Sequence, residues 1–287
     1  MKRVLVIGAD GQLGSDVCSV LEAEHEVLPY TIKDIDVSDE KTCNKIASLK
    51  PDILINTAAY HNVPKCEENP VRSFEVNAIG ALNLAKVCSE NNIAMVHIST
   101  DYVFDGEKKA PYIETDCPKP LNSYAISKVA GESFIQYKWE KHFIIRTSGL
   151  YGEHKCMEKE RNFPETMVYL YKQGKELKVV DDEYLTPTYT RDLAKQIKEL
   201  IKTEKYGLYH ITNNGSCSWY EFAVKLFELL EIDVKIKPIP ASTFPSPVLR
   251  PGYSVLDNFN LRNIGLDKMR LWEEALTDYL SKKSILS

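Results

Sequence analysis

The stretch RVLVIGADGQLG, residues 3–14, decides the fold of this chain. Its first five residues form a short apolar run rich in β-branched side chains, which is typical of a strand buried on both faces. In the turn that follows, Gly8 permits a tight bend, Gly11 lets the backbone approach a pyrophosphate, and Gly14 lets the next helix pack close to the strand. The N–H groups at the start of that helix then face the phosphates, so the stretch predicts a dinucleotide-binding site.

Buried strands recur along the first half of the chain, each followed by a helical pattern. They are expected at 25–30, 52–56, 94–98 and 142–147, with helices over about 71–91 and from 122 onward. In the second half we expect helices over 163–173, 190–203, 218–230 and 268–283, and short strands near 177–180, 207–211 and 234–237. This alternation predicts an α/β fold, a doubly wound parallel sheet whose ligands bind beyond the carboxyl ends of the strands.

The same pattern predicts two domains. We expect a nucleotide-binding domain over 1–160, with elements returning to it near 185–215, and a smaller, mainly substrate-binding lobe over 161–287.

The stretch NSYAISKVAGE at 122–132 predicts a helix that begins at an Asn or Ser cap. Tyr124 and Lys128 are four apart and therefore share one face of that helix. A nearby ammonium lowers the phenol pKa from its usual value of about 10, so the pair predicts a proton donor. The motif alone is short enough to arise by chance. Thr100, however, follows a buried strand and projects into the crevice of the glycine turn, which makes the three residues a constellation.

The end of the second strand bears on the choice of cofactor. It reads Pro29-Tyr30-Thr31, and the first acidic residue beyond it is Asp34. A carboxylate at the strand end would hold the ribose hydroxyls of NADH, and its absence leaves room for a 2′-phosphate. We therefore favour NADPH and leave NADH open. Asp36 and Val37 are placed to meet the adenine, although they could simply form a helix-capping loop. The predicted cofactor-binding residues are Gly8, Gly11, Gln12, Leu13, Gly14, Asp36, Val37, Ala58, Ala59, Tyr60, Asn77, Tyr124 and Lys128.

Composition sets the class of protein. The chain has 287 residues and a net charge of −5, with no basic run to suggest nucleic acid or an acidic membrane surface. Seven cysteines without a C-x-x-C pair favour reduced thiols in the cytoplasm over a disulfide framework. No stretch is apolar enough to span a membrane, and the apolar run at the start is too short for a signal peptide. His154 and Cys156 lack the companions of a metal site, so we expect no metal.

Together these motifs resemble the dTDP-4-dehydrorhamnose reductase family, which belongs to the extended short-chain dehydrogenases/reductases with a Rossmann-type sheet. The similarity covers nearly the whole length. It includes GADGQLG at the start, STDYVFDG at 99–106, LNSYAISKVAGE at 121–132, RTSGLYG at 146–152 and TPTYTRDLA at 186–194.

The resemblance implies a reduction of the C4 ketone of a nucleotide-linked 4-keto-6-deoxyhexose. Tyr124 would be the general acid, Lys128 would hold the nicotinamide ribose, and Thr100 would hydrogen-bond the substrate carbonyl oxygen. Arg250 would meet the nucleotide end of the substrate, the alternative being a surface salt bridge. The substrate-binding residues implied are Val63, Thr100, Asp101, Tyr102, Gly149 and Arg250. Some relatives dimerise, so a homodimer is an open expectation.

Two departures from the family pattern concern the sugar pocket. Relatives carry Trp where this chain has Gly149, so we expect a larger pocket, or one closed by the charged loop at 153–161. The usual D-Q-x-G-x-P-T motif is Asp-Glu-Tyr-Leu-Thr-Pro-Thr at 182–188, which loses a Gln and a Gly.

Rival functions remain open at this stage. A related nucleotide-sugar reductase, a 4-epimerase and a non-catalytic NADP-binding subunit, like the β subunit of methionine adenosyltransferase, are the alternatives. A dehydratase is disfavoured, since Tyr102 stands where that chemistry needs a Glu base.

Overall fold

The computed structural model describes residues 1–154, 161–244, 246, 248–283 and 285. Its centre is a six-stranded sheet in which every neighbouring pair is parallel. The strands are β1 (Arg3–Ile7), β2 (Glu26–Tyr30), β3 (Ile53–Asn56), β4 (Ala94–Thr100), β5 (His142–Thr147) and β10 (Gly207–His210). Their order across the sheet is β10-β5-β4-β3-β1-β2. The chain order reverses between β1 and β3, and in such sheets a ligand crevice opens at that point.

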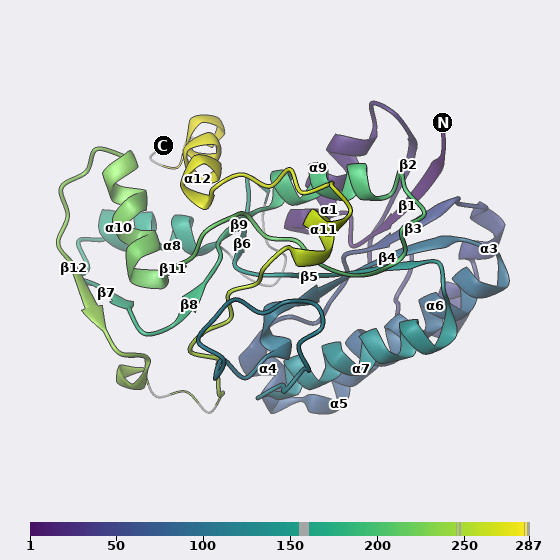
Figure 1. Cartoon of the computed structure of the whole chain (residues 1–287), viewed down its shortest axis with the longest axis horizontal. Helices are drawn as coiled ribbons and strands as arrows, with labels where there is room; N and C mark the ends of the chain where they lie inside the picture. Colours follow the sequence, from purple (N-terminus) through teal and green to yellow (C-terminus); the bar gives the residue numbers. More distant parts are fainter. Residues whose placement is uncertain (155–160, 245, 247, 284, 286–287) are drawn as a thin grey trace.

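Helices cover both faces of the sheet (Figure 1). On one face lie α1 (Gln12–Leu21), α9 (Thr190–Leu200) and α11 (Phe259–Asn263), and on the other lie α6 (Gly80–Glu90) and α7 (Ser123–Lys138). A hydrophobic core lies on each face of the sheet, and alternate residues of β1 point into one or the other. Val4 packs with α1 and α9, whereas Leu5 packs with α6. The predicted doubly wound fold is therefore confirmed.

The predicted helix over 71–91 is observed as three consecutive segments. These are α5 (Pro70–Phe74), a π-helical turn (Glu75–Ile79) and α6. Short helices α2 (Glu40–Cys43), α3 (Ile46–Leu49) and α4 (Val63–Glu68) fill the loops before them. A π turn inside an α-helix frequently marks a functional site.

A further hydrophobic core lies beyond the sheet, at the left of Figure 1. They are α8 (Phe163–Lys172), α10 (Trp219–Leu229), α12 (Trp272–Lys282), β7 (Leu177–Val180) and β12 (Ile236–Ile239), with β7 and β12 paired in parallel. Two-residue strands link this lobe to the sheet: β6 (Leu150–Tyr151) pairs with β9 (Thr188–Tyr189), and β8 (Tyr184–Leu185) pairs with β11 (Cys217–Ser218). The remaining segments are 3-10 turns at Asp101–Val103 and Ala241–Thr243. The exact division into two domains stays a prediction.

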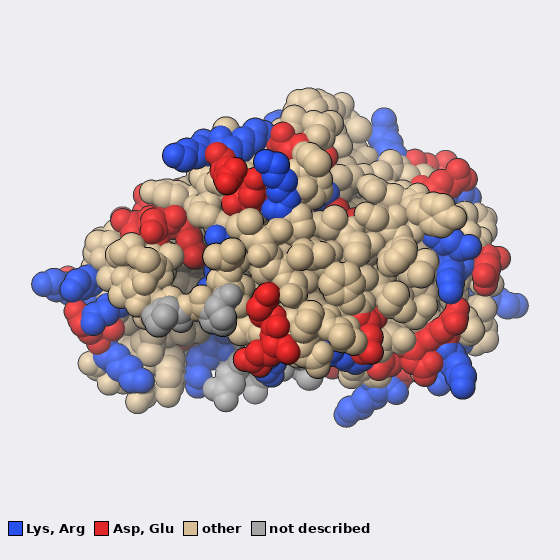
Figure 2. All heavy atoms as spheres, turned by 90° about the horizontal axis from the view of Figure 1, so that it is seen from below, with Lys and Arg blue, Asp and Glu red and all other residues tan. Residues whose placement is uncertain are grey.

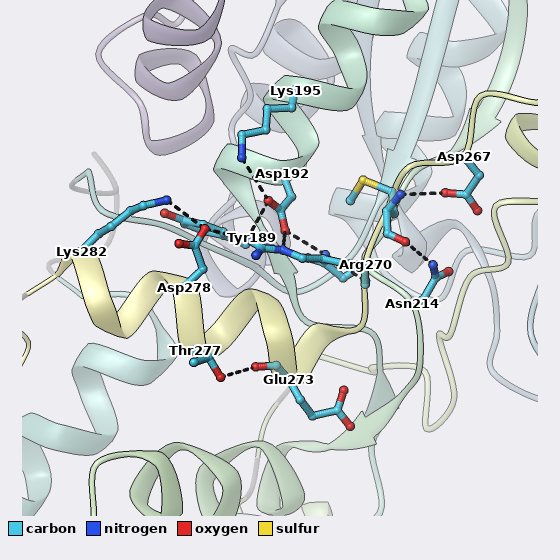
Figure 3. Close-up of polar contacts among 12 residues, drawn as sticks. Tyr189, Asp192, Lys195, Asn214, Asp267, Arg270, Glu273, Thr277, Asp278 and Lys282 are labelled. Atoms are coloured by element: carbon cyan, nitrogen blue, oxygen red, sulfur yellow. Dashed lines mark hydrogen bonds and ion pairs between the residues drawn. The ribbon is translucent and has the colours of Figure 1, made fainter.

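Arg270 joins the two cores (Figure 3). Its guanidinium donates to both carboxylate oxygens of Asp192 on α9, at 2.7 and 2.9 Å, and to Asp278 of α12 at 2.7 Å. Asp192 is nearly buried, while 32% of the Arg270 side chain stays exposed, so the bidentate pair is partly shielded from water.

Candidate active site

The glycine turn has the geometry that its sequence predicts. Gly8 has φ +80°, and a Cβ there would lie 2.9 Å from the backbone nitrogen of Ala58. A Cβ on Gly14 would lie 2.1 Å from the carbonyl oxygen of Gly8, so the helix approaches the strand as closely as the backbone allows. Helix α1 is capped by Gly11 with no side-chain hydrogen bond, so no side chain at the cap competes for the N–H groups of its first turn. This arrangement suits a pyrophosphate.

The two carboxylates that follow β2, those of Asp34 and Asp36, are both held by neighbouring residues. Asp34 accepts hydrogen bonds from the N–H of Thr31 at 2.9 Å and from its hydroxyl at 3.0 Å, so its carboxylate folds back on its own turn. Asp36 accepts from the N–H and hydroxyl of Ser38 and lies 3.7 Å from Arg72. Val37 is buried under Gly80 of α6.

The segment after β3 is held by Asn77 from the π-helical turn. The amide of Asn77 accepts from the N–H of Tyr60 and donates to its carbonyl, both at 2.9 Å. Ala58, Ala59 and Tyr60 are all partly exposed along this edge. The π turn thus places a buried amide where it fixes the backbone beside the predicted cofactor.

The helix that carries Tyr124 is anchored at its first residue. Asn122 caps α7 by accepting from the N–H of Ala125 at 2.9 Å, and Glu67 of α4 accepts from the N–H of Ser123 at 2.9 Å. The phenol of Tyr124 lies close enough to Thr100 for the two hydroxyls to interact, and the Thr100 hydroxyl also donates to Asp101 at 3.1 Å. The structure therefore brings together the hydroxyls of Thr100 and Tyr124, as the sequence predicts.

The predicted effect of Lys128 on Tyr124 is not what the structure shows. Burial raises the pKa of the Tyr124 phenol, and the hydrogen bond with Thr100 opposes this rise only in part. Lys128 points elsewhere, because its Nζ donates to the carbonyl of Ile98 at 2.6 Å and lies 3.1 Å from Nε2 of His97. The pKa of this phenol is therefore raised where the sequence predicts a lowered one. A raised pKa nevertheless keeps Tyr124 protonated, which is the form a proton donor needs.

Lys128 is almost completely buried, and burial lowers its pKa to about 8, while the charge of Glu132 opposes that effect. The sequence analysis missed its two polar neighbours, His97 on β4 and Asn56 on β3. Each is a polar residue within an apolar, buried strand, and that signal could have singled them out.

Asp101 and Tyr102 occupy different environments. Asp101 is buried, accepts from the hydroxyls of Ser148 at 2.8 Å and Ser254 at 2.5 Å, and has a pKa raised by burial. Its carboxylate therefore ties β4 to β5 and to the C-terminal segment instead of facing the crevice. The ring of Tyr102 meets that of Tyr124 edge-on, with centroids 6.3 Å apart.

Arg250 lies beside Tyr102. Burial raises the pKa of Tyr102, and the guanidinium of Arg250, which hydrogen-bonds it, opposes that rise. The preceding carbonyl, that of Leu249, accepts from Asn122 at 2.9 Å, so Arg250 is carried next to the start of α7. Val63 is the first residue of α4 and is partly exposed.

Gly149 does not open the pocket. Its φ is +55°, and a Cβ there would lie 2.7 Å from Cδ1 of Leu185 and 3.1 Å from Cα of Pro187. The expectation of a larger pocket is wrong at this point, because Leu185 fills the space beside the glycine. Leu185 is the residue that replaces the family Gly, so the two departures from the family pattern compensate each other. The charged loop proposed as an alternative closure lies mostly outside the described residues, at 155–160.

The described end of that loop meets the glycine turn. Gln12 donates to the carbonyls of Gly152 at 3.3 Å and His154 at 3.0 Å. In the described ranges, no group of three or more His, Cys, Asp or Glu residues is arranged to hold a metal ion, and Cys156 falls outside those ranges.

A parallel sheet with a glycine turn at its switch point and a Thr–Tyr–Lys set at the same edge defines a nucleotide-dependent short-chain dehydrogenase/reductase. The chain belongs to the family described as RmlD substrate binding domain, whose sequence model matches residues 1–285.

Individual relatives agree with this family. A curated relative, the dTDP-4-keto-6-deoxy-D-glucose reductase of Streptomyces niveus, is 37% identical over 96% of this chain and 95% of its own. The crystal structure of a dTDP-4-dehydrorhamnose reductase from Clostridium acetobutylicum is 41% identical, with a TM-score of 0.93 over 98% of this chain and 99% of that one. The dTDP-4-dehydrorhamnose reductase of Bacillus anthracis, solved in complex with NADP, is 38% identical, with a TM-score of 0.94 and the same coverage.

Proposed function

We propose that this protein reduces the C4 ketone of a dTDP-linked 4-keto-6-deoxyhexose with NADPH, converting dTDP-4-dehydro-L-rhamnose to dTDP-L-rhamnose for cell-surface polysaccharide. The observation that carries the proposal is the contact between Thr100 and Tyr124, a protonated phenol with a hydroxyl partner, at the edge where the glycine turn lies. A pure binding protein has no need of that pair.

The described residues fit a nicotinamide dinucleotide. Gly8 and Gly14 have no room for a Cβ against the neighbouring backbone, and this close packing shapes the turn around Gly11. The first turn of α1, at Gln12 and Leu13, offers N–H groups to phosphate. Asp36 and Val37 would lie by the adenine, Ala58 to Tyr60 along the middle of the cofactor, and Lys128 by the nicotinamide ribose. When bound, the cofactor supplies the hydride.

The residues of the chain supply the proton and the stabilisation. Negative charge builds on the carbonyl oxygen during reduction, and donors placed at that oxygen lower the barrier. Tyr124 gives its phenolic proton to this oxygen. The hydroxyl of Thr100 forms a hydrogen bond with the same oxygen and so orients the substrate. Burial raises the pKa of Tyr124, so the phenol carries its proton before the reaction begins.

The sugar nucleotide would lie between the sheet and the C-terminal lobe. Val63, Tyr102 and the backbone at Gly149 would line the sugar, and Arg250 would bind the diphosphate, since a guanidinium forms paired hydrogen bonds with phosphate. The position of Arg250 beside Tyr102 supports this assignment.

A substrate panel tests the proposal. Oxidation of NADPH is followed by absorbance after addition of dTDP-4-dehydro-L-rhamnose, its D-gluco isomer dTDP-4-keto-6-deoxy-D-glucose, or a UDP-linked ketosugar. We expect turnover with the first substrate and slower turnover with NADH. Preference for the second would reassign the sugar, and a flat trace from protein that binds NADPH would favour the regulatory-subunit alternative.

Location and assembly are part of the proposal. We place the enzyme in the cytoplasm, supported by the lack of any disulfide among the cysteines at described positions. No helix in the described part of the chain is long and apolar enough to cross a membrane. We also propose a homodimer, supported by exposed apolar side chains on α5 and the π turn, namely Val71, Phe74 and Ile79.

A further inference from the structure

Arg250 lies on a stretch of chain, residues 249–254, that is fastened directly to the helix of Tyr124. The carbonyl of Leu249 accepts from Nδ2 of Asn122 at 2.9 Å, and Asn122 is the N-cap of α7, two residues before Tyr124. Because Arg250 follows Leu249, the proposed diphosphate-binding group lies one residue from a contact with the helix that carries the proton donor.

The two hydrogen bonds of the Asn122 side chain have directions that the backbone fixes. The N–H of Ala125 can only donate, so the atom that it meets at 2.9 Å is Oδ1, and the carbonyl of Leu249 can only accept, so it faces Nδ2. Asn122 is 3% exposed, so its amide relies on these backbone partners. One side chain therefore both caps the helix and holds residues 249–254. The two tasks are separable, because the cap needs only an oxygen whereas the link to Leu249 needs an N–H.

The far end of the same stretch is held as well. The carbonyl of Gly252 accepts from the N–H of Tyr184 at 2.9 Å, and the N–H of Ser254 donates to the carbonyl of Tyr184 at 2.8 Å. The hydroxyl of Ser254 donates to Asp101, the residue after Thr100, at 2.5 Å. Arg250 thus lies between two points at which the chain is tied to the catalytic edge of the sheet.

A single side chain, that of Tyr102, lies between Arg250 and Tyr124. The ring of Tyr102 meets that of Tyr124 edge-on, with centroids 6.3 Å apart. Burial raises the pKa of the Tyr102 phenol, and the guanidinium of Arg250 is near enough to oppose that rise. A shift of residues 249–254 would therefore alter the spacing between Arg250 and Tyr124 directly.

We propose that Asn122 is a positioning residue, which through Leu249 sets the spacing between Arg250 and Tyr124 and so aligns the ketone of the bound sugar nucleotide with the proton donor. This inference rests on the proposed function. A substrate held by its diphosphate presents its ketone to Tyr124 only if the two binding groups are correctly spaced. Binding energy from a remote part of a substrate orients the reacting atoms in this way, and a misplacement of about 1 Å can cost about 100-fold in rate.

Asn122→Ser separates the link from the cap. Serine caps a helix about as well as asparagine, so α7 keeps its first turn, but its short side chain has no amide to reach Leu249. We expect kcat for dTDP-4-dehydro-L-rhamnose to fall by about 10-fold, because the ketone and the phenol lose their alignment. Binding of dTDP alone, measured by calorimetry, stays close to wild type, because dTDP has no ketone to align. A loss of dTDP affinity with unchanged kcat would mean that the link serves binding alone, and would overturn the proposal.

A double variant tests whether the effect passes through Arg250. In an Arg250→Ala background Asn122→Ser is expected to cost little more, because the group that Asn122 positions is gone. Losses that multiply would mean that Asn122 acts by another route, and the proposal would fall. Asn69→Ser is the matched control, since Asn69 caps α5 by accepting from the N–H of Arg72 at 3.1 Å, and we expect its turnover to equal that of wild type.

The link can also be measured without any substrate. In Asn122→Ser, amide hydrogen exchange over residues 249–254 is expected to be faster than in wild type and in Asn69→Ser, while the first turn of α7 keeps its protection because its cap remains. No turnover by wild type would remove the proposed function and the role of Asn122 in it. Turnover by wild type together with unchanged exchange in Asn122→Ser would overturn this inference alone.

Discussion

At the scale of single residues, the phenol of Tyr124 carries the proton that the proposed reduction needs. Burial raises the pKa of the phenol, and the only hydrogen bond found to oppose it comes from Thr100. A buried phenol of this kind stays protonated, so it enters the reduction with the proton that the product hydroxyl needs.

The first prediction removes this proton. Tyr124→Phe keeps the ring against Tyr102 but has no hydroxyl, so we expect turnover to fall by about 100–10,000-fold, the usual contribution of a general acid. Binding of NADPH, measured by fluorescence titration, stays nearly unchanged. Turnover within a few-fold of wild type would show that another group donates the proton.

The second prediction concerns the glycine beside Leu185. Gly149→Ala places a Cβ 2.7 Å from Leu185 Cδ1 at φ +55°, so we expect the free energy of unfolding to fall by about 2–4 kcal/mol through overpacking and backbone strain. Gly174→Ala is the matched control. Its φ is +66° with open space around it, so only the backbone part of about 1 kcal/mol is lost.

A double variant separates the cause. In a Leu185→Gly background the effect of Gly149→Ala, measured by urea unfolding, falls toward that of the Gly174 control. An effect that does not change would mean that the backbone at Thr186 and Pro187 fills the space, and the compensation between positions 149 and 185 would be lost.

Residue roles were predictable where the signal is local. The glycine turn and the Tyr124–Lys128 pair each lie within one short stretch, so spacing alone places them. The contacts of His97 with Asn56 and Lys128 depend on the register between β3 and β4. The contact of Gly149 with Leu185 joins positions 36 residues apart in sequence. No local pattern reports such contacts.

At the scale of elements, apolar runs and glycines in the sequence predict the positions of the strands of the central sheet. Each of the first five strands of the sheet was expected within about two residues of its observed bounds, because a strand buried on both faces must be a continuous apolar run. The π turn at Glu75–Ile79 was not predicted. Its residues also fit an α-helix, and the hydrogen bonds of Asn77 with Tyr60, which come from outside the helix, are visible only in the folded chain.

The third prediction tests the link between α9 and α12. Arg270→Ala removes the guanidinium from the nearly buried carboxylate of Asp192, which keeps its contacts with Asn213 and Lys195. We expect the free energy of unfolding to fall by about 1–3 kcal/mol. Lys268→Ala is the control, because its pair with Glu199 is exposed and contributes at most about 1 kcal/mol. Equal thermal unfolding midpoints for the two variants would contradict a joining role for Arg270.

At the scale of the whole molecule, the face seen from below carries charges of both signs. Figure 2 shows Lys and Arg interspersed with Asp and Glu around a broad area of other residues on one face. Exposed apolar side chains gather on α5 and the π turn, around a shallow hollow of about 400 Å³ lined by Pro70, Val71, Phe74, Glu75 and Ile79.

The fourth prediction tests whether the surface around this hollow forms the interface of a homodimer. Light scattering after size exclusion is expected to give about twice the chain mass of 32.7 kDa for wild type and a single chain mass for Phe74→Glu. Phe259→Glu is the matched control, since Phe259 is 38% exposed and Phe74 is 37% exposed, yet Phe259 lies on α11 across the sheet. A monomeric wild type, or dissociation caused by both substitutions, would contradict an interface at α5.

The last prediction links the buried lysine to the stability of the whole chain. Burial lowers the pKa of Lys128 from 10.5, its ordinary value, to about 8 in the folded protein. Between these two pH values the unfolded chain holds a proton that the folded chain has released, so the free energy of unfolding rises with pH. The rise reaches about 3 kcal/mol across this window and is absent below pH 8, where both states are charged. Lys128→Met lacks the titrating group but keeps all the others, so the difference in urea stability between wild type and this variant isolates the effect. We expect wild type to gain on the variant from pH 8 to pH 10.5, and a difference that is flat with pH would mean that the buried nitrogen keeps its charge.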